Sequence, residues 1–158
     1  MKRIALFLAL VLCLSCFAGF AASAEVTPSQ EIDFVTVPMR ATVSILYAIS
    51  AEGYDSLDGL KLVVDKNGKN DEVLPAGYAT VNGKSCIVFQ YDGLSAAEME
   101  LEVSAHVEYN GKAGTAVSYS VKTFADAYAA QGGKYVDLVN AMLKYGAAVK
   151  AMQDAKNA

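Results

Sequence analysis

The side chains that most often perform nucleophilic chemistry are scarce in this 158-residue chain, which has three cysteines and one histidine. Cys13 and Cys16 lie near the N-terminus, which leaves Cys86 and His106 as the nucleophile–base pair to consider. Such a pair needs the thiol and the imidazole within hydrogen-bonding distance and a third group that orients the base. No motif for this chemistry surrounds either residue. The local alternation predicts that Cys86 packs under helices and that His106 faces solvent, so we predict no Cys–His catalytic site.

Glutamates offer a second kind of chemistry, at positions Glu98, Glu100, Glu102 and Glu108. Glycoside hydrolysis needs two carboxyl groups about 5 to 9 Å apart across a sugar-binding cleft. Glu100 and Glu102 would share one face of an extended strand. A solvated strand face explains the same pattern, and the short predicted loops around it offer no cleft. A glycoside hydrolase is therefore the least favoured alternative, and we expect the protein not to be an enzyme.

A polar run over residues 65–72 has the composition of a calcium-binding loop. The helix–loop–helix calcium motif requires oxygen ligands at positions 1, 3 and 5 and glycine at position 6. Counted from Asp65, position 5 is Lys69 and the glycine falls at position 4. The run therefore predicts a polar hairpin loop, with weak surface binding of calcium as the alternative. One histidine and three cysteines also cannot build a zinc or iron–sulfur site without carboxylates, so we predict neither metal nor cofactor.

Nine tyrosines, with no tryptophan, supply much of the aromatic surface on which a sugar ring would stack. Tyr54 and Tyr78 fall near predicted loops and are the candidate ligand-binding residues. Most other tyrosines fall on core-facing strand positions or helix faces, where a buried ring with its hydroxyl at the rim is the ordinary role. The absence of tryptophan weakens the case for a glycan ligand.

Residues 1–24 have the three parts of a secretory signal peptide. Two basic residues precede the apolar run 4–14, and residues 22–24 (Ala-Ser-Ala) end in small side chains suited to cleavage. A membrane anchor is one alternative, although polar residues and glycine interrupt the apolar stretch. A lipoprotein signal is another, because Ser15 precedes Cys16, which would carry the lipid. We expect an extracellular protein, with a membrane-anchored lipoprotein as the alternative.

Removal of the signal peptide would take two cationic residues from the 13 and leave 11 against 17 acidic ones. This balance offers no electrostatic surface for nucleic acid. Charges and glycines interrupt every later apolar run, so we expect no membrane span in the mature chain. The remaining length suits one domain. We expect a short linker over 25–31, a β-sandwich over 32–118 and a helical hairpin over 119–154 packed on the same domain.

The expected fold is mainly β with C-terminal α, an antiparallel β-sandwich of about seven strands followed by a two-helix hairpin. Apolar side chains alternate over 43–49, 86–91 and 101–109, which is typical of strands with one face in a core. The third of these has a polar outer face. The first two have mixed outer faces that another element should cover.

Three Asn-Gly-Lys tripeptides begin at Asn67, Asn82 and Asn110. Asn-Gly is the strongest short signal for a β-hairpin, because a type I′ turn requires positive φ at both central residues. After residue 118 the apolar period changes to three and four, which predicts one helix ending at a glycine pair near 132 and a second of about 20 residues. The hairpin would cover either the apolar outer face or an open end of the sandwich. Gly146, within the second helix, would permit close backbone approach.

Residues 119–122 (YSVK) and 138–148 (LVNAMLKYGAA) are similar to the end of a module found in secreted and cell-surface proteins of anaerobic Gram-positive bacteria. In that module a β-rich segment precedes a "YSVK" helix and an "LxxAMLxYGAA" helix. The resemblance spans about 32–152. It implies an extracytoplasmic location and a β-then-α architecture, and it implies no catalytic residues.

Composition, motifs and resemblance together predict a secreted or cell-surface, non-catalytic binding module whose ligand is a glycan or an envelope protein. The alternative is a structural or assembly domain that docks onto another chain through a sheet edge or a helix face.

Overall fold

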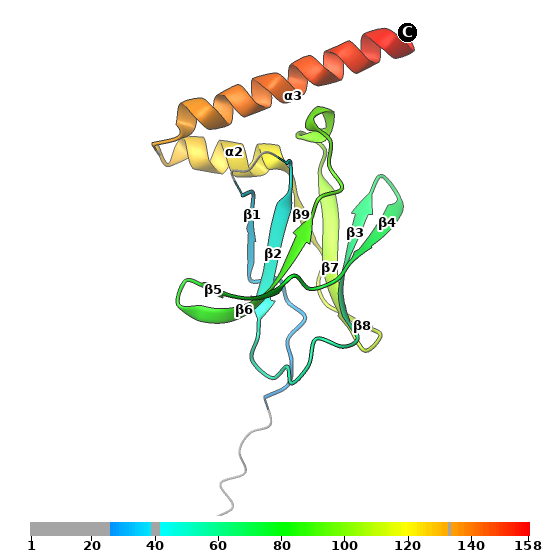
Figure 1. Ribbon diagram of the computed structural model, residues 1–158, viewed down its shortest axis with the longest axis vertical. Helices are drawn as coiled ribbons and strands as arrows, with labels where there is room; N and C mark the ends of the chain where they lie inside the picture. Colours follow the sequence, from blue (N-terminus) through cyan, green and yellow to red (C-terminus); the bar gives the residue numbers. More distant parts are fainter. Residues whose placement is uncertain (1–25, 39–41, 133) are drawn as a thin grey trace, which may run out of the picture.

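Two antiparallel β-sheets pack face to face, and two helices lie across one end of them (Figure 1). This is a computed structural model that describes residues 26–38, 42–132 and 134–158. The predicted fold class is confirmed, with nine strands in the described residues where about seven were expected. The expected signal peptide and Cys16 lie outside the described residues.

The first sheet, sheet A, has the strand order β1-β2-β6-β5. Its strands are β1 (Phe34–Thr36), β2 (Ile45–Ser50), β5 (Gly77–Val81) and β6 (Lys84–Tyr91). Register pairs Ala48 with both Phe34 and Val88, and these three side chains therefore share the face that points away from the core. Tyr47 and Phe89 pair on the opposite, inner face and are fully buried.

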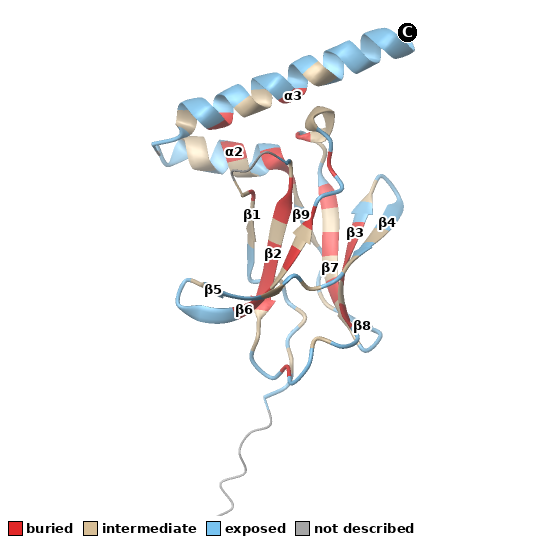
Figure 2. Cartoon of the chain, viewed as in Figure 1, coloured by how far each residue is buried: buried red, intermediate tan, exposed pale blue. Residues whose placement is uncertain are grey.

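The second sheet, sheet B, has the order β4-β3-β7-β8, and β9 also pairs with β7. Its strands are β3 (Leu60–Lys66), β4 (Lys69–Val73), β7 (Val103–Tyr109), β8 (Lys112–Ala113) and β9 (Val117–Tyr119). Leu62, Val64 and Val107 point inward and are fully buried. Figure 2 shows that the buried residues concentrate along the strands between the two sheets.

All three Asn-Gly pairs form the predicted hairpin turns. Asn67, Asn82 and Asn110 have φ of 56°, 51° and 50°, and the glycine after each has φ between 77° and 81°. Both central residues therefore occupy the left-handed region that a type I′ turn requires. These turns join β3 to β4, β5 to β6 and β7 to β8, so the registers of three strand pairs follow from local chemistry.

The segment after the third turn forms two short strands instead of one continuous strand. The strand is interrupted at Gly114. This residue lies so close to the Gln30 carbonyl that a Cβ atom would not fit. Next to it, the Glu31 carboxylate accepts a hydrogen bond from the Thr115 hydroxyl at 2.9 Å. Residues 26–31, expected as a linker, have no regular secondary structure and pack against the sheets through these contacts.

One hydrogen bond joins the two sheets at an open edge of the core. The Tyr91 hydroxyl on sheet A donates to the Asp71 carboxylate on sheet B at 3.1 Å. Burial, followed by this contact with a carboxylate, raises the pKa of Tyr91 to about 12. In the described part of the chain, the buried hydroxyls of Tyr47 and Ser44 have no hydrogen-bond partner.

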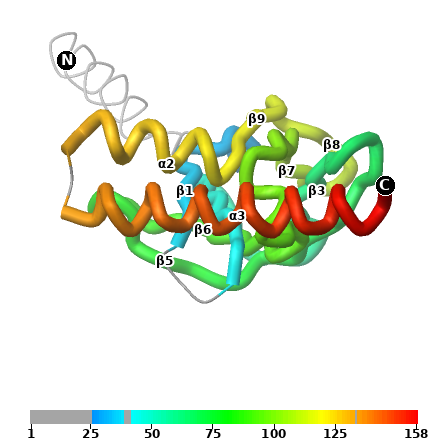
Figure 3. The backbone as a smooth tube through the Cα atoms, turned by 90° about the horizontal axis from the view of Figure 1, so that it is seen from above, coloured from blue at the N-terminus to red at the C-terminus, as the bar shows by residue number. Residues whose placement is uncertain are grey.

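Helix α2 (Val121–Ala130) begins at Ser120, whose hydroxyl accepts the Thr123 backbone N–H at 3.0 Å. Helix α3 (Val136–Asn157) runs back beside α2 and continues past it to the C-terminus (Figure 3). The short helix η1 (Ala96–Glu98) supports α3 from below. At Gly146 a Cβ atom would lie 2.7 Å from the Ala96 carbonyl oxygen, so the predicted close approach is confirmed.

The helical hairpin occupies the second of its two expected positions. It covers the end of the sandwich and leaves the outer face of sheet A uncovered (Figures 1 and 3). Among the described residues, neither helix has the combination of length and apolarity needed to cross a bilayer.

Candidate functional site

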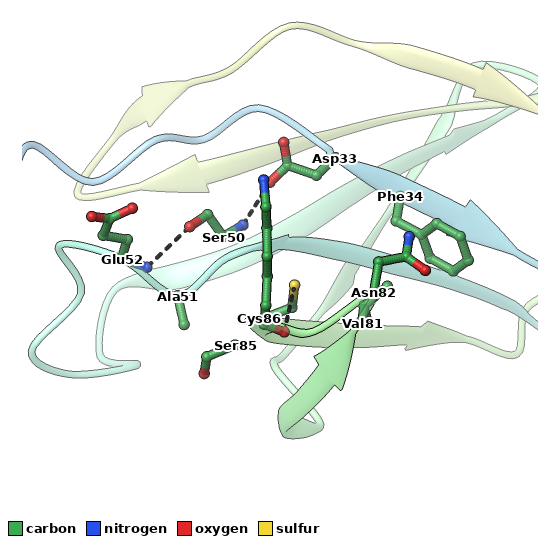
Figure 4. A pocket seen from close by; sticks show the side chains of 10 residues that line it. Asp33, Phe34, Ser50, Ala51, Glu52, Val81, Asn82, Ser85 and Cys86 are labelled. Atoms are coloured by element: carbon green, nitrogen blue, oxygen red, sulfur yellow. Dashed lines mark hydrogen bonds between the residues drawn. The ribbon is translucent and has the colours of Figure 1, made fainter.

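An open groove of about 730 Å³ lies on sheet A, at the end away from the helices. Three segments form it: the start of β1, the end of β2 with the residues after it, and the β5–β6 hairpin. Its volume is in the range of about 300 to 1,000 Å³ that is typical of small-ligand sites. Figure 4 shows Glu52 at one end of the groove and Phe34 and Asn82 toward the other.

Local hydrogen bonds hold these segments in place. The Asp33 carboxylate accepts the Ser50 backbone N–H at 2.8 Å, which fastens the start of β1 to the end of β2. The Ser50 hydroxyl accepts the Glu52 backbone N–H at 3.2 Å and turns the chain after β2. The Asn82-Gly83 turn closes the third side. Both of the first two bonds are drawn in Figure 4.

The groove combines one aromatic ring with several polar groups. Phe34 is 38% exposed and supplies a flat apolar surface. Two carboxylates, one amide and one amine surround it, from Asp33, Glu52, Asn82 and Lys84. Apolar surface with a few convergent polar groups is the usual composition of a site that orients a small ligand. The groove can therefore stack a ring and hydrogen-bond to its substituents.

Of the two tyrosines expected to bind ligand, the structure buries one. Tyr54 is 8% exposed because its ring packs edge-on against Tyr109, with centroids 5.0 Å apart. Its hydroxyl donates to the Ser29 carbonyl at 2.9 Å. The expectation for Tyr54 is thus wrong, since neither face of the ring is open to a ligand. Tyr78 is 57% exposed on edge strand β5, outside the groove.

The structure does not bring Cys86 and His106 together. Cys86 is buried on the outer side of β6, where it lines the groove and its thiol lies 3.7 Å from the Lys84 carbonyl. The expectation that it packs under the helices is wrong, because Cys86 lies near the start of β6, at the opposite end of the sandwich. His106 is on the outer face of sheet B and contacts Glu108 at 3.3 Å. The two sheets separate the thiol from the imidazole.

Glu100 and Glu102 are exposed and precede β7, which begins at Val103, so they do not share a strand face as expected. Neither residue lines the groove. Within the described ranges, no three acidic, histidine or cysteine side chains gather in a way that could hold a metal ion. In the 65–72 run, the Asp65 carboxylate accepts the Gly68 backbone N–H at 2.7 Å and so stabilises the hairpin turn.

The outer face of sheet B carries an ion-pair network. Lys61 pairs with both Glu72 and Glu108, the latter at 3.2 Å. Hydrogen bonding to His106, followed by that to Lys61, lowers the pKa of the Glu108 carboxyl below its ordinary value. The charged groups named here therefore pair with one another across neighbouring strands of sheet B.

Sequence reasoning missed Phe34 and the groove around it. In the segment that begins at Ile32, residues 32 and 34 are apolar on one face of the strand, and residues 35 and 37 are apolar on the other. The pattern therefore could not assign Phe34 to the inner or the outer face. The Asn82 turn was visible as a hairpin signal, but its proximity to Asp33 depends on pairing across about 50 residues of chain. Comparison with protein-family models, with curated proteins and with solved structures found no match to this chain.

Proposed function

We propose that the protein is a secreted or cell-surface, non-catalytic module that binds a glycan in the sheet A groove. The observation that carries this proposal is the pairing of an exposed aromatic ring, Phe34, with the polar side chains of Asp33, Glu52 and Asn82 along one open groove. A pyranose has an apolar face and a rim of hydroxyl groups. The ring complements the face, and the carboxylates and the amide complement the hydroxyls.

The groove is open to solvent and therefore also suits part of a longer chain. A glycan could continue past the site. The predicted N-terminal signal peptide and the resemblance to cell-surface modules support an extracellular encounter with such a polymer.

The test is a titration of the processed protein with a panel of soluble bacterial cell-wall and plant oligosaccharides at millimolar concentration, followed by ¹H–¹⁵N NMR. We expect shifts confined to residues around Phe34, Ser50 and Asn82. Replacement Phe34→Ala removes the stacking surface and should weaken binding by about tenfold or more. Because Phe34 is partly exposed, we expect the fold to survive, as circular dichroism would verify.

Tyr78→Ala is the matched control, because Tyr78 is an exposed aromatic residue of the same sheet outside the groove. It should leave affinity unchanged. Loss of binding in Tyr78→Ala with retention in Phe34→Ala would move the site to the β5 edge. No shift with any oligosaccharide, together with capture of an envelope protein that Phe34→Ala abolishes, would replace the glycan with a protein ligand.

A further inference from the structure

Helix α3 exposes apolar surface that the domain does not use. Its contact with η1 and α2 fully buries only Val139 and Gly146 among its described residues. Leu138, Tyr145 and Met152 remain 54%, 62% and 55% exposed. Figure 2 shows exposed positions along most of the helix. The apolar arc of α3 is therefore wider than its own domain requires.

Six of the exposed apolar residues of α3 follow a heptad. Large side chains recur every seven residues at 138, 145 and 152, and exposed alanines recur with the same period at 141, 148 and 155. Successive members are three and four residues apart, which is the spacing of a coiled-coil seam. We call these six residues the α3 seam: Leu138, Ala141, Tyr145, Ala148, Met152 and Ala155. The seam extends about 26 Å along the helix.

The α3 seam is complementary to itself in one orientation. When two copies run antiparallel about a centre between residues 146 and 147, each large side chain meets an alanine. Leu138 faces Ala155 of the other copy, Met152 faces Ala141, and Tyr145 faces Ala148. A parallel pair would place Tyr145 against Tyr145 and alanine against alanine, which leaves both clashes and voids.

The position of the seam on the helix leaves it accessible to a second helix. At 100° per residue, its centre lies about 130° around the axis from Gly146, which faces η1. The six seam positions carry no charge, and the ion pair between Lys150 and Asp154, at 2.9 Å, is on the other side of the helix. Asp137 and Lys156 border the seam, and in this register Asp137 of one copy lies opposite Lys156 of the other, so a partner helix would bury apolar surface and leave these charges at its rim.

We propose that α3 pairs with α3 of a second copy of this chain, antiparallel and in the register just described, to form a symmetric dimer. One pair of helices of this length falls below the standard interface of about 800 Å² per partner, so the dimer is reversible, with a dissociation constant in the micromolar range. The dimer would also carry two sheet A grooves, one from each copy. The dimer does not depend on the groove binding a glycan.

The test combines sedimentation equilibrium with two adjacent alanine variants of the processed protein. Ala148→Lys places a charge in the seam opposite Tyr145, and we expect the dimer to weaken by about 30-fold or more. Ala147→Lys adds the same side chain one position away, outside the seam, and should leave the dissociation constant unchanged. Both positions are exposed, so helix content by circular dichroism should be the same in the two variants.

Register is tested by disulfides in a Cys86→Ala background. The double variant Ala141→Cys/Met152→Cys should give a covalent dimer on oxidation, because each new thiol faces its counterpart in the other copy. The two thiols of one helix are about 16 Å apart and cannot bridge. Met152→Cys alone should stay monomeric under denaturing conditions, since antiparallel pairing also separates the two copies of residue 152 by about 16 Å.

Four results would overturn the proposal. A monomer at every concentration from about 10 µM to 1 mM excludes the pairing. A covalent dimer of Met152→Cys alone indicates a parallel pair. Equal dissociation constants for the Ala147→Lys and Ala148→Lys variants would place the contact outside the α3 seam. If the chain stays monomeric and the α3 seam binds another protein, the seam serves a different partner.

Discussion

The outer faces of the two sheets differ in their balance of charged and apolar side chains. On sheet B, Lys61, Glu72 and Glu108 form ion pairs across neighbouring strands, and His106 joins them. On sheet A, the corresponding rows carry Phe34, Ala48 and Val88 and end in the groove. Neither face is covered by the helices.

This difference separates a charged, solvated face from the more apolar face on which we propose that a ligand binds. Exposed ion pairs contribute little to folding but keep a sheet soluble and oppose association. An apolar outer face lacks that protection. The contrast teaches that apolar residues on the outer face, and not an absence of charge, distinguish the sheet A surface, since the groove itself contains Asp33, Glu52 and Lys84.

The largest effect should follow when a charge is placed on the apolar face. Ala48→Asp puts a short carboxylate at a position only 2% exposed, between Phe34 and Val88. We expect a loss of about 3 kcal/mol in the free energy of unfolding, measured by urea denaturation. Ser118→Asp, at an exposed position on the outer face of sheet B, should change it by less than about 0.5 kcal/mol. Similar losses in both variants would show that the two faces do not differ in this way.

A smaller effect is expected at the link between the sheets. Tyr91→Phe removes the hydrogen bond to Asp71 and leaves a partly buried carboxylate with one fewer donor. We expect a loss of about 1 to 2 kcal/mol. Tyr47→Phe, on the same inner face, removes a buried hydroxyl that has no partner and should be neutral or slightly stabilising. Thermal denaturation of the two variants would contradict this expectation if Tyr47→Phe lowered the melting temperature more than Tyr91→Phe.

The smallest effect concerns the pH response of the charged face. The folded-state pKa of Glu108 is lowered, so its pairing contributes above the ordinary carboxyl value of 4.5 and is lost as the pH falls through the folded pKa. His106→Gln and Lys61→Met should each move the pKa of Glu108 upward. A ¹³C NMR titration of the side-chain carboxyl measures both shifts. A Glu108 pKa that stays in place in both variants would remove these partners as its cause.

Much of the fold was predictable because it depends on short-range properties. The three Asn-Gly turns require positive φ whatever surrounds them, and the alternation of β6 and β7 identifies their inner faces directly. The helical spacing of apolar residues in α3 and the close backbone approach at Gly146 were equally predictable. The strand break at Gly114 was not, because it depends on contacts with Gln30 and Glu31, more than 80 residues earlier.

The candidate site was predicted poorly for the same reason. Tyr54 has the local setting of an exposed loop tyrosine, yet contacts with Ser29 and Tyr109 bury it. Phe34 lies in a segment that is equally apolar on both faces of the strand. Only its pairing with Ala48 places it on the outer face.

The sequence by itself determined the order of the elements, the hairpin turns, the heptad on α3 and the expectation of export, because periodicity, turn conformation and targeting signals act over a few residues. The tertiary structure alone decided that the helices close an end of the sandwich and not a face. It also decided that Cys86 and His106 lie on opposite sides and that β1 meets the β5–β6 hairpin to form a groove. Those outcomes depend on which distant surfaces pack together, and many side-chain arrangements share the same local pattern.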